Sequence, residues 1–153
     1  MIIRKANKQD AGRIAIIGNS VWVDSYVLDG IDRIVEDYLT TQFSLENVIN
    51  IIENHTVYVF EINGATIGYV VVKQENGKSE IDNFYILPGL QGSGYGKQIL
   101  AHLRQLHSNL WLRCWHKNER ALQFYYKNGF TKIGESYFEL GEERHRNEIL
   151  ESI

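Results

Sequence analysis

The stretch Gln91-Gly92-Ser93-Gly94-Tyr95-Gly96 decides how the middle of this chain folds. It has three glycines within five positions, follows the apolar run 81–88 and precedes a helix-like segment. Glycine has no Cβ, so the backbone can turn tightly and bring its N–H groups close to a ligand. At a helix N-terminus such N–H groups bind anions, and the helix dipole helps them. The stretch therefore predicts a strand, a phosphate-binding loop and a helix in succession.

The flanking sequence predicts the order of the other elements. Strand-like patterns cover 2–5, 56–62, 65–74, 79–87, 110–115, 130–140 and 144–150, and helical patterns cover 7–21, 32–43, 44–53, 96–107 and 118–128. Asn63-Gly64 and Asn76-Gly77 are hairpin-turn signals. Only the part from Ile81 to Trp115 needs a parallel crossover. The sequence thus predicts a mixed α/β sheet with one parallel unit at the glycine loop, a place where ligands bind in such folds.

Size and composition predict an ordinary soluble domain. With 153 residues, 44% of them hydrophobic, the chain suits a single domain over 1–153. A net charge of −3 gives no reason to expect nucleic acid as a partner. The single Cys114 excludes an internal disulfide, and the five histidines lack metal-ligand spacing, so no metal is expected. No signal peptide or membrane span is expected, which makes a reducing cytoplasm the expected location.

The glycine spacing excludes two common phosphate-binding motifs. The dinucleotide pattern G-x-G-x-x-G needs a glycine at position 97 or 99, which are lysine and isoleucine. The nucleotide phosphate loop needs a glycine at position 91 and serine or threonine at position 98, and both positions are glutamine. The remaining pattern is Q-x-x-G-x-G, at Gln91, Gly94 and Gly96.

That pattern resembles the acetyl-CoA loop of the GNAT superfamily of N-acetyltransferases. The neighbouring residues extend the resemblance over nearly the whole chain: Leu87-Pro88 ends the preceding strand, Asn118 opens a later helix, Tyr125 follows seven positions on, and Gly129-Phe130 comes next. The resemblance implies an α/β (α+β) fold with a mostly antiparallel sheet of about seven strands and about four helices on both faces. It also implies acetyl-CoA as co-substrate.

A narrower resemblance is to bacterial polyamine N-acetyltransferases of the PaiA type. Its residues are Trp22–Tyr26, Leu110–Trp115, Lys117–Glu119, Phe124-Tyr125 and Tyr137–Glu143. The last strand departs from that group, which has Asp before an apolar pair ending in Met where this chain has Asn147-Glu148-Ile149-Leu150. This resemblance implies a small polyamine, such as spermidine or spermine, as the acceptor.

The superfamily resemblance also assigns roles to particular positions. The pyrophosphate of CoA would lie on Gln91, Gly92, Ser93, Gly94, Tyr95, Gly96 and Lys97, and the pantetheine arm would pair with Phe84, Tyr85 and Ile86 as an added strand. A backbone N–H near Ile86 or Leu87 would hold the oxyanion. Tyr125 would be the general acid for the thiolate, and Asn118 would contact CoA while capping its helix. The spacing of Tyr125 equally fits a core aromatic residue.

The general base and the acceptor contacts are open. Arg113 stands where some superfamily members have a glutamate, and arginine cannot act as a base. Glu80 and Asp82 are the alternatives, through water. Carboxylates in the N-terminal helical region, among them Asp24, Asp29 and Glu36, are candidates for binding a cationic amine; a solvated helix face is the other interpretation.

Three functions remain as hypotheses. The first is direct transfer of an acetyl group from acetyl-CoA to a primary amine, with a polyamine as acceptor. The second is acetylation of a protein N-terminus or lysine. The third is a CoA-binding sensor or interaction module without catalysis. An exposed edge of the C-terminal strand pair would allow a homodimer.

Overall fold

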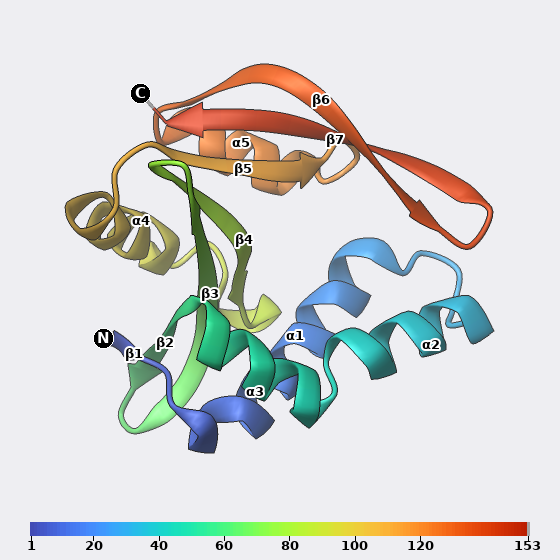
Figure 1. The fold of residues 1–153 in the computed structure, drawn as a ribbon, viewed down its shortest axis with the longest axis horizontal. Helices are drawn as coiled ribbons and strands as arrows, with labels where there is room; N and C mark the ends of the chain where they lie inside the picture. The colour runs from blue at the N-terminus through green and yellow to red at the C-terminus, as the bar shows by residue number, and fades with distance from the viewer. Residues whose placement is uncertain (153) are drawn as a thin grey trace.

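The computed structural model describes residues 1–152, which form a seven-stranded sheet with five α-helices (Figure 1). The strands are β1 (Ile2–Lys5), β2 (Thr56–Ile62), β3 (Ala65–Glu75), β4 (Lys78–Ile86), β5 (Leu110–Trp115), β6 (Phe130–Leu140) and β7 (Glu143–Ser152). The helices are α1 (Ala11–Tyr26), α2 (Arg33–Gln42), α3 (Leu45–Asn54), α4 (Tyr95–Leu106) and α5 (Glu119–Lys127). Two short 3-10 turns, η1 (Lys8–Asp10) and η2 (Pro88–Leu90), precede α1 and the glycine loop.

The strand order is β1-β2-β3-β4-β5-β7-β6, and β4 with β5 is the one parallel pair of the described sheet. The mixed α/β prediction is therefore confirmed, including its parallel unit at the glycine loop. Asn63 and Asn76 both have φ of 52°, as a two-residue hairpin turn requires. The separate helices expected over 32–43 and 44–53 are both present, and Asp32 and Ser44 are their N-caps.

Helices cover the two faces of the first half of the sheet. Side chains alternate along β2 and β3. Val59 and Val71 pack with α1 and α3, whereas Phe60 and Val70 pack on the other face with α4 and α5. Val59, Phe60 and Val70 are completely buried. Figure 1 shows α1 to α3 gathered on one side of β3 and β4, with α4 on the opposite side.

The sheet opens between β4 and β5. Their pairing covers only Ser79 to Ile81 on β4 and ends at Ile81 with Leu112. A bulge against β3 follows at once, because Val71 pairs with Asn83 and Val72 with Ile81, leaving Asp82 as the extra residue. Beyond it β4 keeps β3 as a neighbour and loses β5, and Figure 1 shows the two strands diverging. Along residues 82–86, the edge of β4 that faces away from β3 therefore has no neighbouring strand.

Among residues 1–152, none of the helices combines the length and apolar character that crossing a bilayer requires.

Candidate active site

A cavity of about 700 Å³ lies at the opening between β4 and β5. Residues from α1, β4, the glycine loop, β5 and α5 line it: Asp24, Tyr26, Asp82, Phe84, Tyr85, Ile86, Gln91, Gly92, Gly94, Gly96, Lys97, Arg113, Cys114, Lys117, Asn118, Arg120, Phe124 and Tyr125, among others. Most residues that the sequence assigned to CoA therefore meet in one place. Ser93 and Tyr95 do not line this cavity; Ser93 is exposed and Tyr95 packs against the core.

The glycine loop forms the N-terminus of α4. Gly92 and Gly94 have φ of 82° and 85°, a region that side chains with a Cβ disfavour. Gly94 is the N-cap residue and provides no side-chain cap, so the N–H groups of residues 95–97 have no partner within the helix. Gly96 lies against α5, since a Cβ there would be 3.0 Å from Cζ of Phe124. The loop thus offers N–H groups to an anion at close range.

Three basic residues, Lys97, Lys117 and Arg120, line the cavity, and Nζ of Lys117 lies 5.9 Å from the centre of the Trp115 ring. Nη2 of Arg120 lies 3.6 Å from the position that a Cβ on Gly92 would take. Sequence reasoning missed Lys117 and Arg120. Its position in the first turn of α5 could have revealed Arg120. A positive charge is unfavourable beside the positive end of a helix dipole, so an arginine there suggests that it binds an anion.

The free edge of β4 carries unpaired backbone groups. The N–H of Leu87 donates to the carbonyl of Ile67 at 2.9 Å, which places residue 87 among the pairs bonded to β3. Because bonded and non-bonded pairs alternate, the N–H groups of Phe84 and Ile86 point to the opposite edge, away from β3. The carbonyl of Ile86 accepts a bond of 2.8 Å from Nε2 of Gln91, which ties the strand end to the loop.

Tyr125 is a buried residue of α5 whose ring packs between Phe124 and Phe130, with centroids 5.3 and 5.4 Å away. Burial raises the pKa of its phenol well above the usual value, and the neighbouring Cys114 adds to the rise. Burial also raises the pKa of Cys114, to about 12. Tyr125 therefore belongs to the core and lines the cavity at the same time.

Asn118 is the N-cap of α5, and its Oδ1 accepts a bond of 3.3 Å from the N–H of Ala121. Capping by Asn118 is thereby confirmed, and its side chain also borders the cavity.

The two candidate bases are both paired with cations. Glu80 is half-buried and lies 3.6 Å from Nε of Arg113, while Oδ2 of Asp82 lies 3.1 Å from Nζ of Lys73. Burial raises the pKa of Glu80, and the charge of Arg113 opposes that rise. Asp82 lines the cavity directly, and Glu80 lies just behind it on the same strand.

The candidate acceptor carboxylates are spread out. Asp24, near the end of α1, lines the cavity. Asp29, between α1 and α2, and Glu36, in the first turn of α2, are exposed and lie outside it. The structure thus brings one of these three predicted residues to the site.

A second, smaller cavity of about 330 Å³ lies between β3–β4 and helices α1 to α3. Trp22, Tyr38, Tyr69, Lys73 and Asn83 are among its lining residues. It shares Asp82 and Tyr85 with the first cavity, so the two adjoin at β4. Sequence reasoning gave no sign of this cavity.

The model of the acetyltransferase (GNAT) domain family matches residues 53–132, which run from the end of α3 through the glycine loop to the start of β6. The chain belongs to the GNAT acetyltransferase family. Within residues 1–152, no group of three or more His, Cys, Asp or Glu side chains is arranged to hold a metal ion.

Relatives of this GNAT protein share part of its length. An uncharacterised N-acetyltransferase from the pepI 3′ region of Lactobacillus delbrueckii subsp. lactis is 28% identical over 106 residues, 61% of each chain. The Escherichia coli peptidyl-lysine N-acetyltransferase YiaC is 27% identical over 73 residues, 48% of each chain. The chain thus spans about six tenths or less of the length of these curated relatives.

Solved structures share the GNAT fold over almost the full length. The PaiA N-acetyltransferase of Thermoplasma acidophilum in complex with coenzyme A has a TM-score of 0.84 at 20% identity, covering 99% of this chain and 97% of that one. A chimera of the spermidine N-acetyltransferase SpeG from Vibrio cholerae and hSSAT has a TM-score of 0.71 at 16% identity, covering 99% and 94%. At these identities the likeness establishes the fold alone.

Proposed function

We propose that this protein is an N-acetyltransferase that transfers the acetyl group of acetyl-CoA to a primary amine, by direct attack of the amine. The observation that carries the proposal is the position of the glycine loop. The loop lines a cavity of about 700 Å³ that residues of the free edge of β4 also line. CoA fits both features, because its pyrophosphate would lie at the loop and its extended pantetheine arm, which carries amides, would lie along β4.

The loop residues fit a pyrophosphate. The N–H groups of residues 95–97 face outward from the start of α4 and would donate to phosphate oxygens. Lys97 and Arg120, which also line the cavity, would add charge-assisted hydrogen bonds to the phosphate oxygens. Gly92, Gly94 and Gly96 allow the backbone to come this close.

The free edge of β4 fits the pantetheine arm. The N–H groups of Phe84 and Ile86 would bond to its amides or to the acetyl carbonyl oxygen, as an added strand would. Leu87 is already bonded to Ile67, so the N–H of Ile86 is the better donor for the oxygen that gains charge.

Tyr125 would donate a proton to the departing thiolate. A phenol with a raised pKa keeps its proton at neutral pH, and it lines the same cavity as the β4 edge. Glu80 or Asp82 would take the proton of the amine, directly or through water. Both lie on β4 close to the point where it leaves β5.

We propose a polyamine such as spermidine or spermine as the acceptor. The PaiA-type sequence features support this class, as does the likeness in fold to a spermidine N-acetyltransferase. Asp24 would contact one of the cationic groups of the acceptor. The similarity to a peptidyl-lysine N-acetyltransferase supports a protein lysine as the second candidate.

The test is release of CoA thiol from acetyl-CoA with a panel of amines, with the products identified by mass. The panel holds spermidine, spermine, a lysine peptide blocked at its N-terminus and a peptide with a free N-terminus. We expect turnover to be highest with the polyamines. A preference for the lysine peptide would favour the second candidate. Tight acetyl-CoA binding without turnover of any amine would favour a silent CoA-binding module and contradict the enzyme proposal.

A further inference from the structure

The second cavity combines several aromatic side chains with one carboxylate. Five aromatic residues line it, and the ring centroids of two of them, Trp22 and Tyr38, are 5.0 Å apart; the other three are Phe43, Tyr69 and Tyr85. Among its lining residues Asp82 is the only carboxylate. Aromatic faces and a carboxylate together favour an ammonium group over an anion or a purely apolar group.

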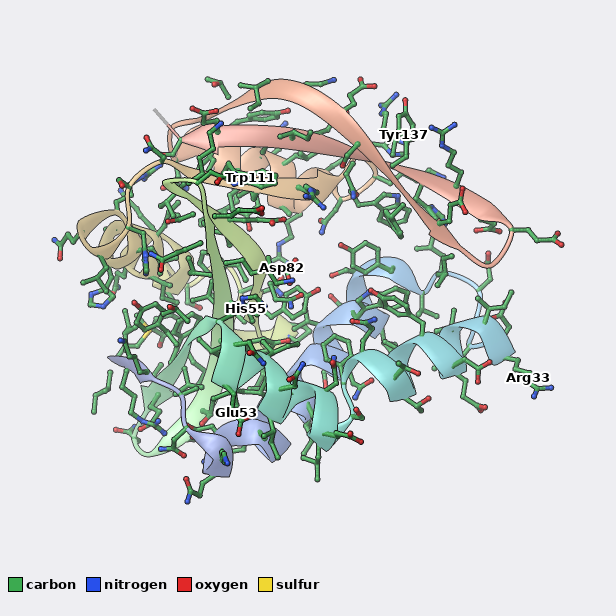
Figure 2. All side chains as sticks on the ribbon, viewed as in Figure 1. Arg33, Glu53, His55, Asp82, Trp111 and Tyr137 are labelled. Carbon is green, nitrogen blue, oxygen red and sulfur yellow. The ribbon has the colours of Figure 1, made fainter. Side chains whose placement is uncertain are left out.

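The bulge in β4 directs Asp82 into this cavity. Asp82 is the extra residue between two regular pairs, and it lines the second cavity together with its neighbour Asn83. Without the bulge, side chains would alternate and successive residues would face opposite sides of the sheet. Because Asp82 also lines the first cavity, a molecule that reacts at the free edge of β4 can extend past Asp82 into the second. In the view of Figure 2, Asp82 lies between β5, which carries Trp111, and the helical half of the protein.

The ammonium group of Lys73 lies where an ammonium group bound to Asp82 would lie. Its Nζ lies 3.1 Å from Oδ2 of Asp82, and both side chains are partly exposed, at 38% and 34%. Lys73 is also the only basic residue that lines the second cavity. A lysine side chain is a primary ammonium on four methylene groups, which is chemically the end of a polyamine.

Of the two carboxylates on β4, Asp82 is the one whose cationic partner can be replaced. Glu80, on the same strand, faces Arg113, and the guanidinium of Arg113 is further held over the ring of Trp111 at 5.1 Å. Lys73 has a flexible stem and a partly exposed ion pair of small net stability, so its ammonium is easily displaced.

We propose that Asp82 and the second cavity bind the non-reacting ammonium of the acceptor, which leaves Glu80 as the base, and that Lys73 occupies this subsite until the acceptor displaces it. This inference rests on the proposed acetyl transfer for the identity of the reacting end. Lys73 would then be an internal competitor that lowers the affinity for acceptors with two ammonium groups and leaves monoamines unaffected.

The experiment removes the competitor. Lys73→Met keeps an unbranched apolar side chain, shorter by one heavy atom, and deletes the charge. We measure the Kd of spermidine by calorimetry in the presence of CoA, and the ratio of kcat/KM for spermidine to that for pentylamine, a monoamine. We expect spermidine to bind about two- to fivefold more tightly, the range for a partly exposed ion pair, and the ratio to rise in the same proportion. Lys73→Arg, which keeps the charge, should behave like the unchanged protein.

Two further variants separate the inference from other effects. Lys8→Met breaks an ion pair of similar length with Glu53 outside both cavities and should change neither quantity. Asp82→Asn should weaken spermidine binding, and adding Lys73→Met to it should give no gain.

Unchanged spermidine affinity in Lys73→Met, or a gain that persists without Asp82, would overturn the inference. Calorimetry decides this even if no amine is turned over, so failure of the proposed enzyme activity remains distinguishable.

Discussion

At the residue scale, Tyr125 combines a structural and a proposed chemical role. Its ring packs between Phe124 and Phe130, and its phenol lines the main cavity. Replacing the hydroxyl alone therefore separates the two roles, since phenylalanine fills the same space in the core.

We expect Tyr125→Phe to lower kcat about 100-fold or more, the usual contribution of a general acid, with little change in the KM for acetyl-CoA. Steady-state thiol release, with thermal unfolding as the control for folding, measures both effects. Unchanged turnover from neutral to alkaline pH would remove the acid role from Tyr125.

Also at the residue scale, Glu80 and Asp82 can be distinguished by pH. A base must be ionised to accept a proton, so activity falls as pH drops through its pKa. Burial raises the pKa of Glu80 above 4.5, which moves this acid limb upward. If Glu80 is the base, Glu80→Gln should lose the limb from the profile of kcat/KM against pH. Loss of the limb in Asp82→Asn instead would assign the base to Asp82.

At the element scale, the loop before α4 depends on backbone conformations that only glycine adopts easily. Gly94 has φ of 85° and open space where a Cβ would go, so alanine there would strain the backbone without a steric clash. Gly77, in the hairpin between β3 and β4, has φ of 75° and the same open space, which makes it a matched control.

We expect Gly94→Ala and Gly77→Ala each to lower the free energy of unfolding by about 1 kcal/mol, the order of the strain in this region. Only Gly94→Ala should weaken acetyl-CoA binding, by about tenfold, because relaxing φ turns the N–H groups of α4 away from the phosphate. Denaturant unfolding and calorimetric titration measure the two quantities. Equal acetyl-CoA affinity in both variants would mean that the loop geometry is not what binds the cofactor.

At the scale of the whole molecule, a charged network joins the N-terminal strand to α1 and β2. Asp10 is fully buried and accepts hydrogen bonds from Arg4 at 2.8 and 2.9 Å and from Arg13 at 2.8 Å. Arg4 also donates from Nε to Glu61 at 2.7 Å. The bonds from Arg4 are the main reason that the pKa of Asp10 falls to about 2.

We expect Asp10→Asn to lower the free energy of unfolding by about 2–3 kcal/mol, less than for a fully buried pair because Arg4 is partly exposed. The folded-state pKa is depressed, so this contribution is complete above about pH 4 and disappears as pH falls toward 2. Denaturant unfolding between pH 2 and 7 measures it. Asp37→Asn, at an exposed position of α2, is the control, and an equal loss there would contradict the network's role.

Two whole-molecule expectations stay predictions: a single folding domain over 1–153 and a cytoplasmic location. A homodimer is likewise a prediction, for which β6 offers the outer edge of the sheet. Unfolding in one cooperative transition would support the first, and sedimentation would test the last.

Local sequence signals were enough to predict the turns and the helix start around the site. Asn63-Gly64 and Asn76-Gly77 specify hairpins, and Gly94 with Gly96 specifies the turn into α4, because these depend on backbone freedom within a few residues. The spacing of Asn118 and Tyr125 likewise predicted one helix that begins after Asn118 and contains Tyr125.

Which side chains share a cavity depends on the tertiary structure. The reach of Arg120 to the loop depends on how α5 packs beside it, and the pairing of Asp82 with Lys73 accompanies a bulge within the β3–β4 hairpin that the turn signal Asn76-Gly77 does not reveal. Strand pairing joins residues far apart in the chain, and a shift of one residue reverses the face of every side chain that follows. For that reason the glycine loop could be found from sequence spacing, and Tyr125 only through the resemblance to a family, whereas the second cavity could not be found from the sequence.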